Sequence, residues 1–248
     1  MTAAVPEAPP DPEWRVDLLG GFRVCDGGGP IELSADAERL VAFLALQARR
    51  VPRAHAAGSL WMECSQHRAF GNLRVTLFRL RRDAAGLVNA DNRTVGLDPE
   101  TLVDINRIAG WGDATLIDRP HNGATVDDLR PLGLELLAGW DDEWTVVERE
   151  RIRQLSLHRL EEIADRLIDR RRPALAIQAA LMAIGSDPLR ESAHRRLIRA
   201  HLAEGNVAEA LRSYRNLEDL LSTELGIAPT QLFGEIAASV EHLVPSLD

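Results

Sequence analysis

The sequence predicts an α+β domain followed by an all-α domain of helical repeats, so that the chain is mainly α overall. Apolar and polar residues alternate around Gly-rich turns over residues 14–33, which is typical of short strands. From Ser34 the apolar spacing becomes helical, and beyond residue 120 it remains helical. We divide the 248 residues into a disordered Pro/Ala-rich tail at 1–12, an α+β domain at 13–108 and a helical-repeat domain at 120–245.

The α+β domain shows a defined order of elements. Its strands are expected near Trp14, Phe22 and Ile31, with Gly-rich turns between them. Three helices at residues 34–51, 54–61 and 68–85 and a hairpin with a tight turn at Asp91-Asn92 are expected to follow. Sheet, three helices and hairpin are the order of a winged helix-turn-helix of the OmpR type, which is a DNA-binding fold.

The third of these helices has two different faces. At 100° per residue, Leu73, Leu77 and Leu80 fall on one side and are expected to pack inward. The opposite side carries Arg68, Gly71, Val75, Phe78, Arg79 and Arg82, with Asn72, Arg74 and Arg81 beside it. Arginine binds phosphates and pairs with the O6 and N7 atoms of guanine, as a helix in the major groove requires. Phe78 either contacts a thymine methyl group or packs against the hairpin.

Positive charge is concentrated around this helix, although the whole chain has a net charge of −9. Between residues 49 and 82 a single acid, Glu63, stands against eight arginines: Arg49, Arg50, Arg53, Arg68, Arg74, Arg79, Arg81 and Arg82. Local charge is what meets phosphates, and a solvated helix face is the alternative explanation. The predicted DNA-binding residues are these eight arginines with Asn72, Val75 and Phe78 and, at the hairpin tip, Asn92, Arg93 and Thr94.

The composition disfavours several function classes. All 29 basic residues are arginine, so the chain has no Walker A lysine and no Schiff-base lysine. Cys25 and Cys64 are isolated and the seven histidines are scattered, so no metal motif results. Because no nucleophile–base set accompanies the carboxylates, we expect no enzymatic activity, no cofactor and no metal. With neither an export signal nor an apolar run that could cross a bilayer, we expect a cytoplasmic protein with no membrane partner.

The C-terminal domain is predicted to consist of paired helices, at residues 124–139, 141–171, 173–184, 189–202, 207–225 and 230–243. An offset of 34 residues aligns Ala174 with Ala208, Ala176 with Ala210, and Ile163 with Leu197. This is the tetratricopeptide period, in which small residues let paired helices approach and stacked pairs share a core. Such a domain either binds a protein partner or serves only folding and dimerisation.

Several segments together carry a family resemblance. They are Leu18–Phe22, Ala37–Leu46, Leu60-Trp61, Asn72–Arg82, Glu148–Arg151, Asp187–Glu191, Ala208–Tyr214 and Glu224–Gly226. From Trp14 to Ala237 the chain resembles the Streptomyces antibiotic regulatory protein (SARP) family with its bacterial transcriptional activator domain. In that family the third helix reads the groove, which here is Asn72–Arg82. The connection before it, Met62–His67, matches a loop that touches RNA polymerase or its sigma factor in related proteins, and it is short here.

The resemblance implies an actinobacterial transcription activator that binds direct repeats near promoters and contacts RNA polymerase. The expected partners are double-stranded DNA, RNA polymerase or a sigma factor, and a second copy of the chain, at least on DNA. The alternative hypothesis is a protein-interaction adaptor whose winged helix has lost DNA reading. The acidic C-terminal part, the short connection and an exposed Phe78 favour this alternative.

Overall fold

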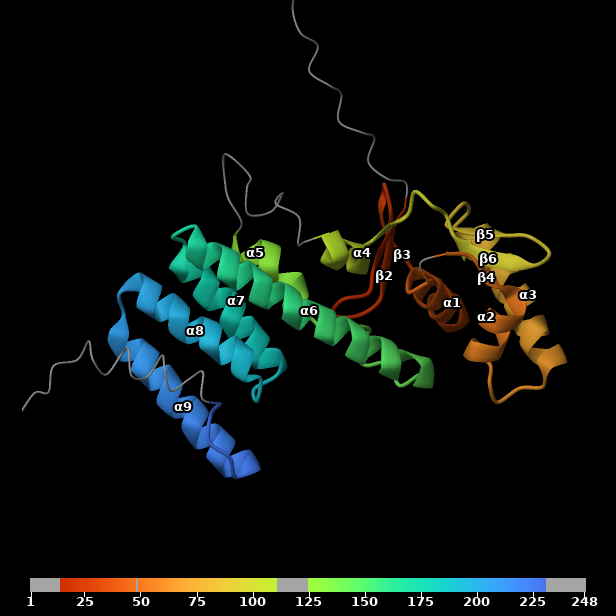
Figure 1. The fold of residues 1–248 in the computed structure, drawn as a ribbon. Coiled ribbons are helices and arrows are strands. Elements are labelled where there is room, and N and C mark those ends of the chain that lie inside the picture. Colours follow the sequence, from red (N-terminus) through yellow and green to blue (C-terminus); the bar gives the residue numbers. More distant parts are fainter. Residues whose placement is uncertain (1–13, 48, 111–124, 231–248) are drawn as a thin grey trace, which may run out of the picture. The chain divides into compact units, whose positions relative to one another are not determined.

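The computed structural model describes residues 14–47, 49–110 and 125–230, which form two compact units. The N-terminal unit comprises residues up to Arg107 together with Glu135–Glu150, and the C-terminal unit comprises Ile108–Leu134 and residues from Arg151 onward. The described chain is mainly helical with a small N-terminal β region, as the sequence predicts (Figure 1). The predicted tail at 1–12 lies outside the described residues.

Two small sheets and several helices make up the N-terminal unit. Its elements are β1 (Trp14–Asp17), β2 (Arg23–Asp26), β3 (Gly29–Ile31), α1 (Ala35–Ala45), β4 (Val51–Pro52), α2 (Arg53–Leu60), α3 (Gln66–Asp83), β5 (Val88–Ala90), β6 (Thr94–Leu97), β7 (Leu102–Val103) and the start of α4 (Asp104–Gly110). One sheet has the order β3-β2-β1-β7, in which β7 is parallel to β1 and the other pairs are antiparallel. The other sheet has the order β4-β6-β5 and is antiparallel. The expected antiparallel sheet and hairpin are present, and the parallel strand β7 is an addition.

Helix α1 packs against α2, α3 and β6 and supplies much of the core of this unit. Leu40, Val41 and Leu44 are buried on it, which confirms the predicted apolar stripe. Burial of each such side chain contributes about 1.5–3 kcal/mol. The helix ends at Ala45 and does not reach Pro52, because Val51–Pro52 pairs with β6 as strand β4.

Residues 135–150, which we call the returning segment, pack in the N-terminal unit. The sequence assigns them to the helical-repeat domain. The backbone N–H of Leu137 donates to the Leu18 carbonyl at 2.8 Å, and the N–H of Gly20 donates to the Glu135 carbonyl at 2.7 Å. The N-terminal unit is therefore built from two stretches of sequence, which differs from the single boundary predicted between residues 108 and 120.

Aromatic rings fasten the returning segment to the N-terminal unit. The ring centroids of Trp140 and Phe22 lie 5.7 Å apart, and Trp144 meets Phe43 edge-on at 5.7 Å. Such pairs contribute about 0.5–1.5 kcal/mol beyond the area that they bury. Arg149 donates hydrogen bonds to backbone carbonyls of the same segment and holds its turn together.

Helices make up the described part of the C-terminal unit. They are α5 (Val126–Leu129), the 3-10 turn η1 (Arg130–Gly133), most of α6 (Glu143–Asp169), α7 (Pro173–Ser186), α8 (Glu191–Glu204) and α9 (Val207–Leu225). Helix α7 packs on α8, and α8 packs on α9 (Figure 1). The predicted continuous helix at 124–139 is wrong, because Pro131 cannot donate a helical hydrogen bond and Leu137 has a left-handed φ of 48°. All but the first residue of the predicted helix at 230–243 lies outside the described residues.

A buried carboxylate joins α6 to the start of α8. Glu161 accepts hydrogen bonds from Nε of Arg190 at 2.7 Å and from the Ser192 hydroxyl. Burial by itself raises the pKa of Glu161, but these hydrogen bonds and the nearby Arg196 together hold this pKa below its ordinary value. The carboxylate therefore stays charged and fixes the first turn of α8 against α6.

Candidate nucleic-acid interface

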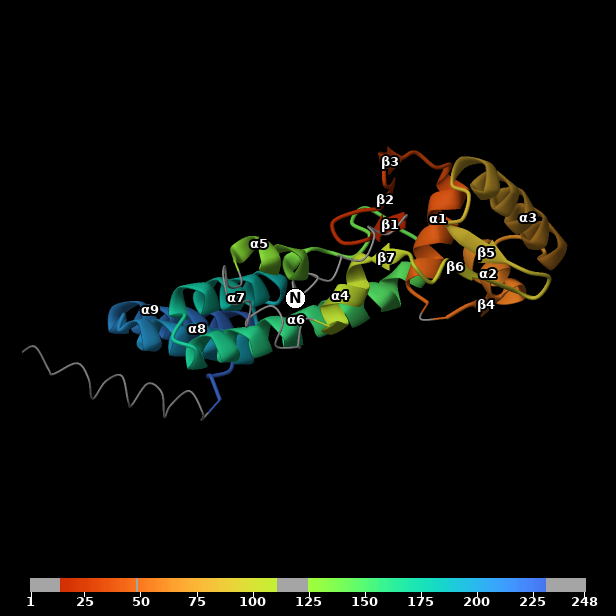
Figure 2. The same ribbon diagram turned by 90° about the horizontal axis from the view of Figure 1, so that it is seen from above.

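Helix α3 is anchored by one apolar side. Leu73, Leu77 and Leu80 are buried, as their spacing predicts. The helix packs against α1, α2 and β5, and Figure 2 shows it along the outer edge of the N-terminal unit. It begins at Gln66, two residues earlier than predicted, and ends at Asp83. The opposite side of α3 is therefore held in a fixed orientation toward solvent.

Arginines dominate this outer side of α3. Four of them are exposed and form no salt bridge within the part of the chain that the structure describes: Arg68, Arg74, Arg79 and Arg81. Arg82 is also exposed, but its Nε lies 2.6 Å from the Asp83 carboxylate. Four guanidinium groups are thus available to an anionic partner, and Arg82 must exchange Asp83 for that partner.

An apolar strip runs between these arginines. The side chain of Phe78 is 71% exposed and that of Val75 is 50% exposed. The idea that Phe78 packs against the hairpin is therefore wrong. Gly71 lies one turn before Val75, and a Cβ placed on it would meet nothing within 4 Å. Asn72 is half-buried beside the strip.

The connection between α2 and α3 is short, and the end of α2 that precedes it is linked to the returning segment through Arg39. It spans Trp61–Ser65, where the sequence predicts the six residues 62–67. Arg39 in α1 donates to the Leu60 carbonyl at 2.8 Å and, through its Nε, to the Asp142 carboxylate at 2.8 Å. Local patterns could not reveal this contact, because Arg39 and Asp142 are 103 residues apart in sequence.

The β5–β6 hairpin owes its shape to Asp91. Its carboxylate accepts hydrogen bonds from the backbone N–H groups of Arg93 and Thr94, both at 2.7 Å, and from the Thr94 hydroxyl at 2.9 Å. These bonds lower the pKa of Asp91 to about 2. The two-residue turn is Asn92-Arg93, one position later than predicted, and both of its side chains are exposed. The sequence identifies Asp91 as a turn residue but does not show this supporting role.

Two of the predicted arginines support this hairpin. Arg50 lies 3.0 Å from the Asp91 carboxylate, and Arg53 donates to the Asp91 carbonyl at 3.1 Å. A Cβ on Gly96 would come within 2.7 Å of Cγ of Arg50, so strand β6 approaches β4 closely because residue 96 is glycine. Arg50 and Arg53 therefore position the hairpin, while Arg49 is exposed beside them.

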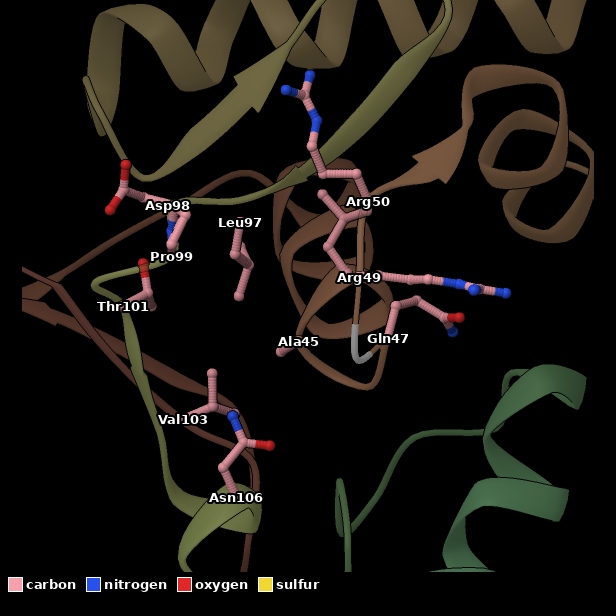
Figure 3. A pocket seen from close by; sticks show the side chains of 11 residues that line it. Ala45, Gln47, Arg49, Arg50, Leu97, Asp98, Pro99, Thr101, Val103 and Asn106 are labelled. Carbon is pink, nitrogen blue, oxygen red and sulfur yellow. The ribbon is translucent and has the colours of Figure 1, made fainter.

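A pocket of about 240 Å³ lies beside Arg49, between the end of α1 and the chain after β6 (Figure 3). Ala45 and Leu97 supply part of its apolar lining, and the buried Thr101 hydroxyl has no hydrogen-bond partner among the described residues. Figure 3 shows the side chains of Arg49 and Arg50 extending in different directions. Arg49 is thus separated from the group of residues that stabilises the hairpin.

The described residues contain no group of three His, Cys, Asp or Glu side chains that could hold a metal ion. Among the described helices, none is long and apolar enough to cross a bilayer. The N-terminal unit thus presents exposed guanidinium groups on α3 and at the hairpin tip, with an apolar strip between those of α3.

Comparisons with known proteins bear on both units. Residues 132–240 match the bacterial transcriptional activator domain family. The chain is 26% identical over 247 residues to the regulatory protein AfsR of Streptomyces coelicolor, in a match that covers 94% of this chain and 25% of AfsR. It is also similar to the structure of Mycobacterium tuberculosis EmbR in complex with a low-affinity phosphopeptide. That match has a TM-score of 0.67 at 19% identity and covers 95% of this chain and 66% of the EmbR chain.

These matches differ in what they show. The chain spans a quarter of the length of AfsR and about two thirds of the EmbR chain. At 19% identity the likeness to EmbR shows the fold alone. The activator-domain match covers the whole returning segment and most of the C-terminal unit. Residues 132–240 thus match the bacterial transcriptional activator domain, and the similarity to AfsR, a regulatory protein, agrees with the resemblance to the Streptomyces antibiotic regulatory protein family.

Proposed function

We propose that the chain is a transcription regulator whose N-terminal unit is a winged helix-turn-helix that binds double-stranded DNA. In this proposal α2 and α3 form the helix-turn-helix, α3 lies in the major groove and the β5–β6 hairpin is the wing. The outer side of α3 carries the proposal, because it presents on a firmly anchored helix four exposed arginines that form no salt bridge with any described residue. The net charge of −9 does not oppose binding, since the charge near the phosphates decides the local field.

The position of each arginine suggests its role. Arg68 and Arg79 lie near the centre of the outer side and are proposed to reach base edges, where arginine pairs with guanine. Arg74 and Arg81 lie at its margin and are proposed to bind phosphates. Arg93 at the wing tip is proposed to bind the sugar–phosphate backbone or the minor groove.

The C-terminal unit supports the tetratricopeptide-like part of the proposal. Ala176 and Ala210, which are 34 residues apart, are both fully buried. Ile163 and Leu197, which are separated by the same distance in sequence, are both buried to within a few percent of exposure. Equal burial at equivalent positions is expected of stacked repeats. We propose that two copies of the chain bind promoter-proximal direct repeats and that the regulator activates transcription by contacting RNA polymerase or a sigma factor.

The first experiment selects duplexes from random-sequence DNA with the full chain and measures their affinity by fluorescence anisotropy across a salt series. We expect enrichment of a defined sequence and a steep fall of affinity with salt, because each neutralised phosphate contributes a slope of about −0.9 in log K against log salt. Failure to bind any duplex at low salt would contradict the proposal.

Variants then test the roles of individual arginines. Arg79→Ala is expected to weaken binding about tenfold or more and to relax base preference at one position, whereas Arg74→Ala is expected to reduce the salt slope by about 1. Arg212→Ala is the matched control, because Arg212 is an exposed arginine of α9, with 66% of its side chain accessible. Equal affinity of all three variants would show that Arg74 and Arg79 do not contact DNA.

A protein-interaction adaptor is the second candidate function. The exposed Phe78 and Val75 favour it, because an uncovered apolar strip also suits a protein partner. Under this alternative the chain selects no duplex, and its anisotropy signal is absent even at low salt. The same selection experiment therefore separates the two candidates.

A further inference from the structure

The apolar strip on α3 has a defined place within the arginine-rich side. Val75 and Phe78 are three residues apart and therefore neighbours on one helix face, about 4.5 Å apart along its axis. Gly71 lies one turn before Val75 and two turns before Phe78 on the same line, with open space above it. The strip thus consists of a flat opening at Gly71, a branched aliphatic group and an aromatic ring.

The exposure of this strip needs a partner that is apolar and lies among phosphates. Phe78, at 71%, is among the most exposed large apolar side chains of the described residues, and arginines lie on both sides of it. A purely apolar protein surface would leave these guanidinium groups desolvated and unpaired. In the major groove, the only methyl group that a base presents is the C5-methyl of thymine, a few ångströms from the phosphates that arginine binds.

We propose that Val75 and Phe78 read thymine methyl groups, so that the binding site requires thymine at defined positions in addition to the bases contacted by arginine. The inference rests on the proposed DNA-binding function and specifies one base, thymine, that the DNA site must contain. The open space at Gly71 lets the helix approach the base edges closely enough for van der Waals contact with a methyl group.

The test removes single methyl groups from the DNA. A duplex selected by the full chain is resynthesised with each thymine replaced in turn by deoxyuridine, which keeps every hydrogen-bonding group and lacks only the methyl. At one or two positions we expect the wild-type affinity to fall about fourfold, which corresponds to about 0.8 kcal/mol for one buried methyl group.

Variants assign the methyl contact to its residues. Phe78→Ala is expected to bind the thymine duplex more weakly and to bind the thymine and deoxyuridine duplexes equally at the sensitive position, and Val75→Ala tests the second contact in the same way. Both residues are exposed, so neither variant removes core packing. Val147→Ala, at a 73% exposed apolar residue of α6, is the matched control and should keep the full discrimination.

The outcomes distinguish the inference from the function on which it rests. If the wild-type chain binds every deoxyuridine duplex as tightly as the thymine duplex, or if Val75→Ala and Phe78→Ala both keep the full discrimination, the methyl-reading inference is overturned while DNA binding stands. If no duplex is selected at all, the proposed function itself fails. Loss of discrimination in Phe78→Ala but not in Val147→Ala supports the inference.

Discussion

Replacing Gly71 by alanine is expected to have opposite effects on folding and on DNA binding. Gly71 lies inside α3, its φ is not in the left-handed region, and an added Cβ would meet no atom within 4 Å. Alanine loses less backbone entropy than glycine in a helix, so Gly71→Ala should stabilise the N-terminal unit by about 0.5–1 kcal/mol. No atom of the described residues lies close enough to the added Cβ to oppose this gain.

The same methyl group projects from the side of α3 that is proposed to enter the major groove. If the helix packs closely on the base edges, the added methyl overpacks the interface at a cost of about 1–3 kcal/mol, as in a filled core. Affinity should therefore fall at least fivefold, and about tenfold for each 1.4 kcal/mol. A variant that is more stable yet binds less tightly separates an interface effect from a folding defect.

Urea unfolding followed by tryptophan fluorescence measures the stability change, and anisotropy with the selected duplex measures the affinity change. Gly185→Ala is the matched control, because Gly185 lies in α7 of the C-terminal unit and also has open space around its added Cβ. It should gain stability without losing affinity. Unchanged DNA affinity of Gly71→Ala would refute the close approach of α3, and lower stability would refute the view of an open helix surface.

Three further predictions concern the supports of the fold. Asp142→Ala should lower the free energy of unfolding, measured in urea, by about 1–3 kcal/mol, because it removes the partly buried carboxylate that accepts a charge-assisted hydrogen bond from Arg39. Asp141→Ala, at the exposed neighbouring residue, is the control and should change this free energy by less than about 0.5 kcal/mol. The pKa of Asp91 is lowered from 3.8 to about 2, so the stabilisation that its carboxylate gives the hairpin is complete above pH 4 and is lost as the pH falls through 2. The amide chemical shift of Thr94, followed by NMR, should titrate in this window. A midpoint near the ordinary value of 3.8 would contradict the hydrogen-bonded turn. Glu161→Gln should destabilise the C-terminal unit by about 1–3 kcal/mol in urea unfolding, because it leaves the half-buried guanidinium group of Arg190 without this counter-ion, and a change below about 0.5 kcal/mol would show that the pair is dispensable.

Local periodicity predicts the candidate interface well. The burial of Leu73, Leu77 and Leu80 follows from their angular spacing alone, because helix geometry depends on neighbouring residues. The exposed arginines follow from the same spacing. The angular spacing places Phe78 on the outer face but does not show whether its ring contacts the hairpin or stays exposed to a partner, and the structure shows it exposed.

Contacts between distant residues could not be predicted in this way. The pairing of β7 with β1 and the contact of Arg39 with Asp142 join residues far apart in sequence, and neither leaves a local pattern. The roles of Arg50 and Arg53 were missed for the same reason, because a charged residue beside a predicted DNA-binding helix looks equally suited to phosphate or to Asp91. The position of the turn in the β5–β6 hairpin was also off by one residue, because the hydrogen bonds to the Asp91 side chain determine where the turn lies.

The discontinuity of the N-terminal unit also affects its folding during synthesis on the ribosome. Chains emerge from the N-terminus, so α1 to α3 are synthesised before the residues that complete their packing, which end at Glu150. Until Trp140 and Trp144 are synthesised, Phe22 lacks the ring of Trp140 and Phe43 keeps only His55 of its two ring neighbours, so both phenylalanines can contact chaperones or other nascent chains. A fragment that ends at Gly110 would lack this packing permanently, whereas a fragment that extends through Glu150 contains all the residues that complete the core of the unit.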